Sequence, residues 1–220
     1  MFFLVLKNMD NKRTSIYIDG FNLYYGCLKK SPYKWLDLKR LFENLLDSSH
    51  QINKIKYYTT HISSRNDNEA SRIRQRYYLN ALEKYIPELE IYYGHYLTHK
   101  INAKVVNPPP EFIQVYKTEE KGSDVNLALH VLNDAWLDQY NCAVIVSNDS
   151  DLAESLRLVK SQTKKLIGVI FPNTDHKRKP SRELVQYANF IKPIRQNLLR
   201  NSQLPDNIPG TEIYKPSAWQ

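Results

Sequence analysis

Short, unbroken apolar runs alternate with helix-like stretches along this chain, and that alternation restricts the fold more than any other feature. The clearest runs lie at residues 143–146, which read Ala-Val-Ile-Val, and at residues 166–171. Strands without polar residues at alternate positions are typical of a sheet that is covered by helices on both faces. The pattern therefore predicts an α/β fold, a three-layer α/β/α sandwich with a mostly parallel central sheet.

The same pattern assigns the remaining elements. Helices are expected where apolar residues recur every three or four positions, and Asp37 can cap one of them. In the long helix, Ile73, Tyr77, Ala81 and Tyr85 are spaced four apart and are expected to share one face. The other expected strands lie at residues 15–18, 52–60, 89–97, 112–117 and 190–194, and the expected helices at 22–28, 38–45, 68–86, 123–135, 152–159 and 181–187.

The length of 220 residues and the hydrophobic content of 42% suit one compact domain. We expect an N-terminal extension at residues 1–13, a domain at 14–195, and a C-terminal tail at 196–220 that packs on the domain or is partly flexible. No run approaches the ~20 apolar residues of a membrane span, and the opening apolar run is too short for a signal peptide. Cys27 and Cys142 have no metal or redox spacing. These features indicate a cytoplasmic protein with no membrane contact.

The charge balance points to a polyanionic partner. The chain has 31 Lys and Arg against 23 Asp and Glu, a formal net charge of +8. Such an excess can displace counterions from nucleic acid, although basic proteins that bind none are also common. RNA is therefore the expected partner.

Acidic residues follow two of the expected strands directly. Asp19 comes after the strand at 15–18, and Asp149 and Asp151 come after the strand at 143–146. A third position, Asp124, stands at the start of a helix. In open α/β sheets, sites form beyond the carboxyl ends of the strands, so these acids are expected to lie close together.

Each acid also has an ordinary structural alternative. Asp19 with Gly20 could be a simple turn, and Asp124 and Asp151 could be helix caps. Together, however, several carboxylates at one point repel each other, and a divalent cation commonly compensates them. Oxygen ligands without a His or Cys cluster favour Mg²⁺ or Mn²⁺ over zinc. A metal-assisted phosphoryl reaction with no small-molecule cofactor is the chemistry that these residues favour.

Three stretches in order carry a family resemblance: Tyr17-Ile-Asp19-Gly-Phe-Asn22-Leu-Tyr-Tyr25, Lys121-Gly-Ser-Asp124-Val-Asn-Leu-Ala128 and Val146-Ser-Asn-Asp149-Ser-Asp151-Leu152. With them the chain resembles the NYN branch of the PIN-like nuclease superfamily, the bacterial LabA-like group, over residues 14–195. The resemblance implies a PIN-like sheet and a metal site made by Asp19, Asp124 and Asp149.

The resemblance also implies supporting roles and one departure. Asp151 would help to hold metal or water, and Asn22 would orient Asp19 or contact phosphate. Where many relatives carry a further Asp in the helix after the Lys-Gly-X-Asp motif, this chain has His130. That difference keeps open a lower metal affinity or an altered ion preference.

Basic and aromatic residues near these motifs are the candidates for RNA contact. Arg72 and Arg76 are four apart and share a helix face, which suits a phosphate track or a plain solvated surface. Tyr24 and Tyr25 could stack on unpaired bases, although most of the 16 tyrosines suit core packing better. The further basic candidates are Lys121, Lys177, Arg178, Lys179 and Arg182.

These features together predict a divalent-metal-dependent endoribonuclease that hydrolyses structured RNA such as tRNA, or single-stranded RNA. The catalytic candidates are Asp19, Asn22, Asp124, Asp149 and Asp151. The alternative is a non-catalytic RNA-binding regulatory module on the same fold. A phosphatase of the haloacid-dehalogenase type is disfavoured because Asp19 is followed two residues later by Phe21 and not by Asp. A homodimer is left open.

Overall fold

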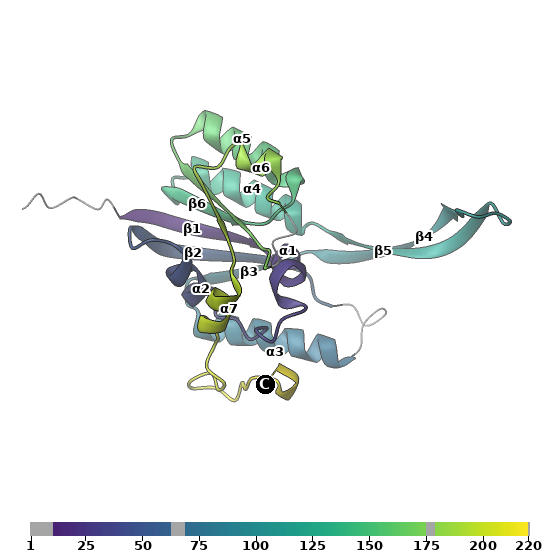
Figure 1. Cartoon of the computed structure of the whole chain (residues 1–220), viewed down its shortest axis with the longest axis horizontal. Helices are drawn as coiled ribbons and strands as arrows, with labels where there is room; N and C mark the ends of the chain where they lie inside the picture. Colours follow the sequence, from purple (N-terminus) through teal and green to yellow (C-terminus); the bar gives the residue numbers. More distant parts are fainter. Residues whose placement is uncertain (1–10, 63–68, 175–178, 220) are drawn as a thin grey trace, which may run out of the picture.

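The computed structural model describes residues 11–62, 69–174 and 179–219. Its centre is a six-stranded sheet in the order β3-β2-β1-β6-β7-β8, and every neighbouring pair in it is parallel (Figure 1). This agrees with the predicted α/β fold. The strands are β1 Lys12–Asp19, β2 His50–Thr59, β3 Leu89–Tyr93, β6 Cys142–Val146, β7 Leu166–Phe171 and β8 Phe190–Pro193.

Helices cover both faces of the sheet. On one face lie α4, α5 and α6, and on the other lie α1, α2, α3 and α7 (Figure 1). Their bounds are α1 Gly20–Leu23, α2 Leu38–Leu45, α3 Glu69–Tyr85, α4 Ser123–Trp136, α5 Ala153–Gln162, α6 Arg182–Val185 and α7 Gln196–Asn201. A π-helical turn, Tyr24–Leu28, continues α1, and short 3₁₀ turns lie at Ser150–Leu152 and Ser217–Trp219.

Alternation along the central strand creates two cores. Successive strand residues point to opposite faces, so Ile16 and Ile18 pack with the α2 and α3 side while Tyr17 packs with α4 and α5. All three side chains are fully buried. The strands are apolar without interruption because helices cover both faces of the sheet, as predicted.

The strand order places a topological switch between β1 and β6. The chain moves outward from β1 through β2 and β3, and then returns to the other side of β1 to form β6, β7 and β8. Loops at such a switch diverge to opposite faces and leave a crevice beyond the carboxyl ends of the two strands. Asp19 and the 147–151 loop lie at that position.

The predicted face of the long helix is wrong. In α3 the buried side chains are Tyr78, Leu79, Ala81 and Leu82, whereas Ile73, Tyr77 and Tyr85 are 39%, 42% and 38% exposed. A step of four residues overshoots the helical turn of 3.6 residues, so such a row winds around the helix. Tertiary contacts determine which face of α3 is buried. Tyr78 packs on Trp35 and donates a hydrogen bond to the Leu36 carbonyl.

The expected strand at 89–97 is two strands. It breaks at Gly94, after which β4 (His95–Lys104) pairs antiparallel with β5 (Phe112–Lys121). A Cβ atom on Gly94 would lie 2.0 Å from Glu120 Oε1, so only glycine permits this close approach. The two strands form a separate ribbon that projects from the domain as an arm (Figure 1), longer than the single strand expected at 112–117.

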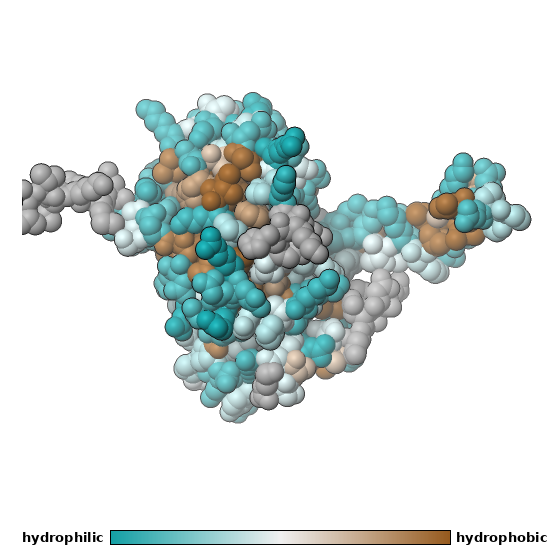
Figure 2. Space-filling model, viewed as in Figure 1, coloured by the Kyte–Doolittle hydropathy of each residue, from teal (hydrophilic) through white to brown (hydrophobic). Residues whose placement is uncertain are grey.

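Both faces of the arm carry apolar side chains. The antiparallel register places Ile101 opposite Val115 and Ala103 opposite Ile113 on one face. Phe112 and Tyr116, which are 53% and 71% exposed, lie on the other face, because successive strand residues alternate. Figure 2 shows apolar side chains gathered toward the outer part of the arm. Two-stranded ribbons are marginally stable alone in water.

The chain after β8 packs against the α2 and α3 side of the domain. Leu199, Leu204 and Ile208 are buried. Trp35 donates a hydrogen bond from Nε1 to the Pro205 carbonyl, and its ring lies 6.2 Å from that of Trp219 between centroids. Trp219 also contacts Tyr78 on α3, so the tail contributes directly to this core.

Within the described ranges, no helix is both long and apolar enough to cross a membrane. Both cysteines are buried free thiols, and burial raises the pKa of each to about 12.

Candidate active site at the carboxyl ends of β1 and β6

Asp19 is the most buried of the predicted acids, with 3% of its surface exposed. It ends β1 and caps α1 by accepting a hydrogen bond of 2.9 Å from the Asn22 backbone N–H. The Asn22 side-chain amide also donates to it, as does the Ser147 hydroxyl at 2.9 Å. These hydrogen bonds are the ones expected if Asn22 orients Asp19. Asp19 is thus both the N-cap of α1 and a candidate site residue.

The loop after β6 is organised by the same network. Ser147 accepts a hydrogen bond of 3.1 Å from the Asp149 backbone N–H, and Asp149 Oδ1 accepts one of 3.0 Å from the Asp151 backbone N–H. Asn148 donates its own backbone N–H to Asn22 Oδ1 at 3.3 Å. Asp149 is half-buried and Asp151 is exposed. These bonds connect the two strand ends directly, as the sequence predicted.

Asp124 lies in the first turn of α4. Burial, followed by the charges of Asp19, Asp149, Glu120 and Asp151, raises its pKa to about 6. Like charges raise the pKa of a carboxyl group only when they are nearby, so Asp19, Asp149 and Asp151 lie in the neighbourhood of Asp124.

Glu120 is a fifth acid that the sequence analysis missed. It lies at the base of the arm and accepts hydrogen bonds from the Thr60 hydroxyl at 2.9 Å and the Ser123 hydroxyl at 2.8 Å. It also adds to the raised pKa of Asp124. The sequence did contain one indication of this role. Glu120 precedes Ser123 by three residues, and a carboxylate at that spacing can accept a hydrogen bond from the start of the next helix.

The pKa of Asp19 is raised as well, chiefly by burial and also by Asp149, while the hydrogen bonds from Asn22 and Ser147 lower it. No Lys or Arg of the described chain forms an ion pair with Asp19, Asp124, Asp149 or Asp151. The site is an uncompensated cluster of negative charge. Oxygen donors of this kind suit a hard divalent cation.

The carboxylates are near one another but are not gathered around one point. Among residues 11–62, 69–174 and 179–219, no three His, Cys, Asp or Glu side chains lie close enough to hold a metal ion. The donor chemistry therefore fits Mg²⁺ or Mn²⁺, but the described carboxylates are too far apart to surround one ion.

His130 does not take the place of the acid that many relatives carry. Its Nδ1 lies 2.9 Å from the Tyr58 hydroxyl, and its ring lies 4.4 Å from that of Tyr92. It follows Asp124 by six residues on the helix, a rise of roughly 9 Å. The charges that act on its pKa come from Lys56, Asp134 and Glu90, and burial lowers that pKa first. His130 belongs to an aromatic cluster between α4 and the outer strands.

The predicted RNA-contact residues are spread around the crevice. Tyr24 and Tyr25 are 39% and 59% exposed, and their rings contact each other at 5.3 Å beside α1. Asn148 Nδ2 donates to the Lys179 carbonyl at 3.3 Å, which places the Lys179 backbone beside the loop that carries Asp149. Arg182 is exposed in α6. Lys177 and Arg178 lie outside the described residues.

Two other basic candidates already have acidic partners. Arg72 pairs with Glu69 at 2.6 Å, and Lys121 pairs with Glu119 at 3.1 Å. Arg72 and Arg76 line a hollow of about 200 Å³ beside His61 and Ile62, which follow β2. Arg72 and Arg76 thus share a face as predicted.

Comparison with known proteins gives the family. The NYN domain family matches residues 13–198. The chain is 37% identical to 6-hydroxy-3-succinoylpyridine 3-monooxygenase HspA of Pseudomonas putida over an alignment of 245 residues, which covers 97% of this chain and 78% of the relative.

A solved structure supports the fold. A protein of unknown function from Vibrio parahaemolyticus superposes with a TM-score of 0.53 and 15% identity, over 89% of this chain and 98% of that one. At this identity the likeness concerns the fold alone. The family match and the conjunction of Asp19, Asp124 and Asp149 at one crevice agree with each other, and the chain belongs to the NYN domain family, a branch of the PIN-like nucleases.

Proposed function

We propose that the protein is a divalent-metal-dependent endoribonuclease that hydrolyses RNA phosphodiesters, either in structured RNA such as tRNA or in single strands. The observation that carries the proposal is the pKa of Asp124, raised to about 6 by burial and by Asp19, Asp149, Glu120 and Asp151. Carboxylates that repel one another in this way are stabilised when they bind a cation. Mg²⁺ or Mn²⁺ would be held by Asp19, Asp124, Asp149 and Asp151.

The residues of the chain have distinct tasks in this proposal. A bound Mg²⁺ or Mn²⁺ supplies Lewis acidity toward phosphate and a lower pKa for water. Asn22 and Ser147 stabilise the ionised form of Asp19 with their hydrogen bonds. Asp149 orders the start of the 3₁₀ turn at Ser150–Leu152, which keeps Asp151 at the crevice. Burial and the neighbouring acids raise the pKa of Asp124 to about 6, so a bound cation would favour its ionised form.

The surface around the crevice supports RNA as the substrate. The net charge of +8 is available to phosphates outside the acidic cluster. Tyr24 and Tyr25 offer exposed rings one turn beyond Asp19, where unpaired bases could stack. Lys179 and Arg182 approach from the α6 side, and Lys121, Arg72 and Arg76 from the arm and α3.

The test uses purified wild type and Asp149→Asn with total tRNA and a single-stranded RNA, in Mg²⁺, Mn²⁺ or EDTA. Cleavage by wild type that disappears in EDTA and in Asp149→Asn is expected. Asp206→Asn, an exposed acid in the tail, is the matched control and should cleave normally. Cleavage that survives in Asp149→Asn would remove this site assignment. Salt-sensitive binding without cleavage in any metal would favour the non-catalytic RNA-binding module.

A second candidate function comes from the relative of 37% identity, which is named as a monooxygenase of 6-hydroxy-3-succinoylpyridine. The match over 97% of this chain is the observation in its favour. A monooxygenase adds one oxygen atom of O₂ to its substrate and needs two electrons from a donor to reduce the other to water. Oxygen uptake with 6-hydroxy-3-succinoylpyridine and NADH, compared with and without substrate, tests it directly.

Cytoplasmic location and a homodimer stay predictions. The face of the arm that carries Ile101, Ile113 and Val115 is the surface that supports association of two copies.

A further inference from the structure

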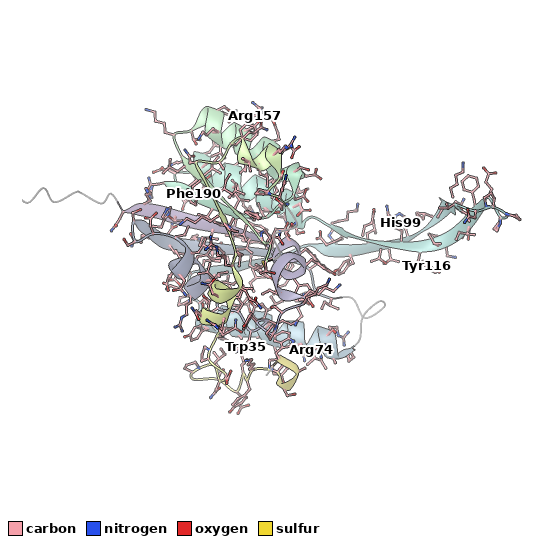
Figure 3. All side chains as sticks on the ribbon, viewed as in Figure 1. Trp35, Arg74, His99, Tyr116, Arg157 and Phe190 are labelled. Atoms are coloured by element: carbon pink, nitrogen blue, oxygen red, sulfur yellow. The ribbon has the colours of Figure 1, made fainter. Side chains whose placement is uncertain are left out.

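A cleft of about 280 Å³ begins at Gly20, the residue after Asp19, and extends to Arg74 on α3. Tyr57, Tyr78 and Trp219 form part of its wall. In Figure 3 the side chains of Arg74 and Trp35 lie along α3, on the face of the sheet opposite α4 and α5. The volume is just below the ~300 Å³ at which ligand pockets usually begin, so the cleft has room for one small ring system.

Two cations in this cleft have no acidic partner in the described part of the chain. Lys34 donates to the Ser31 carbonyl, and Arg74 donates to the Ser71 hydroxyl at 2.9 Å. Neither forms an ion pair with a described carboxylate, unlike Arg72 on the same helix as Arg74. Both residues line the same cleft, and burial together with the charge of Arg74 lowers the pKa of Lys34. An anion between them would relieve that repulsion.

Tyr57 places a hydroxyl at the cleft. Its side chain is only 6% exposed and lines the cleft. Among the described side chains, only Glu88 Oε2 is both buried and without a partner, so the Tyr57 hydroxyl opens onto the cleft. A Cβ on Gly20 would lie 2.9 Å from this hydroxyl, which places it directly at the Asp19-Gly20 turn. A ligand in the cleft would have this hydroxyl within reach as a donor.

We propose that the cleft binds a flat aromatic heterocycle that carries an anionic group. The ring would lie against the Tyr and Trp walls, the anion would meet Lys34 and Arg74, and Tyr57 would donate to an acceptor on the ring. Two sources share this chemistry: a nucleotide of the RNA whose base is unstacked, and a free aromatic acid. The inference goes beyond the proposed function and does not depend on cleavage.

Binding is measured with the full-length Asp149→Asn protein in EDTA, which prevents turnover. The probes are adenosine 5′-monophosphate and 3-succinoylpyridine, each followed by tryptophan fluorescence, because Trp219 lies in the wall and Trp35 lies 6.2 Å behind it. Saturable binding of at least one probe is expected. Adding Arg74→Ala should weaken it about tenfold or more, and Tyr57→Phe about fivefold.

Arg157→Ala is the control, because Arg157 is an exposed arginine on α5 that pairs with Glu154 outside the cleft, and the affinity of this variant should stay within about twofold of the parent protein. Thermal unfolding of each variant is measured to check that it is folded. Binding of the nucleotide alone assigns the cleft to RNA, and binding of the acid alone assigns it to a small substrate. No binding of either probe at millimolar concentration, or binding unchanged in both Arg74→Ala and Tyr57→Phe, would overturn the inference. Nucleotide binding without metal-dependent RNA cleavage would instead remove only the proposed nuclease function.

Discussion

The Ser147 hydroxyl donates a hydrogen bond of 2.9 Å to Asp19 Oδ2 and so connects the carboxyl ends of β6 and β1. The two residues are 128 positions apart in the sequence. The same hydroxyl oxygen accepts the Asp149 backbone N–H at 3.1 Å. One side chain therefore positions two of the acids of the crevice.

Ser147→Ala should shift the pH dependence of cleavage upward. The hydroxyl lowers the pKa of Asp19 by bonding its ionised form, so its removal raises that pKa further. Activity should consequently fall more at pH 6 than at pH 8 in a pH–rate profile. Ser155→Ala, which removes another buried hydroxyl bonded to the Leu152 carbonyl, is the control. Both should lose about 1 kcal/mol of stability, but only Ser147→Ala should alter the profile.

Asp124 should make the metal-free protein less stable as the pH rises. Its pKa is about 6 in the folded protein against an ordinary value of 3.8, so the folded form binds more protons between these values. The free energy of unfolding should fall from about pH 4 to about pH 6 and stay low above. In EDTA at pH 7.5, Asp124→Asn should melt above wild type, with no such gain at pH 4.

Metal should reverse that loss. Mg²⁺ or Mn²⁺ at pH 7.5 is expected to raise the Tm of wild type and to raise that of Asp124→Asn less, since a ligand stabilises the folded form that binds it. Differential scanning fluorimetry across metal concentrations measures both effects. Equal metal-induced shifts in the two proteins would contradict a role for Asp124 as a ligand.

His130→Asp should not improve metal binding. The ring contacts Tyr58 and Tyr92, and a carboxylate in its place would add negative charge near Asp134 and Glu90. We expect an unchanged Mg²⁺ affinity by calorimetry and a loss of about 1 kcal/mol in the free energy of unfolding. A clear gain in affinity would show that this position does reach the acids.

The buried pair of Lys56 and Asp134 should be essential for stability. Lys56 Nζ lies 2.7 Å from Asp134 Oδ2, which also accepts the Tyr17 hydroxyl at 2.7 Å. Lys56→Met leaves a buried carboxylate without its cation, and the expected loss is about 3–5 kcal/mol. Lys54→Met on the same strand removes a pair with Glu90 that is partly exposed, and should cost less than about 1 kcal/mol in urea denaturation.

The arm should determine the oligomeric state. If two copies associate through the face that carries Ile113, Ile113→Lys should lower the dimer fraction in light scattering after size-exclusion chromatography. Gln114→Lys is the matched control, because neighbouring strand residues point to opposite faces. A wild type that is monomeric at all concentrations would contradict the homodimer.

The parallel sheet and the acids at its carboxyl edge could be predicted from local patterns in the sequence. Unbroken apolar strands, such as residues 143–146, indicated burial on both faces, and β6 and β7 were recovered within a residue because local hydrophobicity defines them. Asp19 and Asp149 could be placed together since the carboxyl ends of parallel strands meet at one edge. These inferences depend only on order along the chain and on the two-residue period of a strand.

Other features depend on contacts between segments that are distant in the sequence. The buried face of α3 depends on Trp35 and Trp219, which lie far away in sequence, and the break at Gly94 depends on the approach of Glu120. Glu120, Ser147 and Tyr57 gained their positions at the crevice through contacts that no local pattern records. The sequence left the consequence of His130 open, and the structure places its ring against Tyr58 and Tyr92. Packing between distant segments selects which side chains face the crevice, and this information is absent from any short window of the sequence.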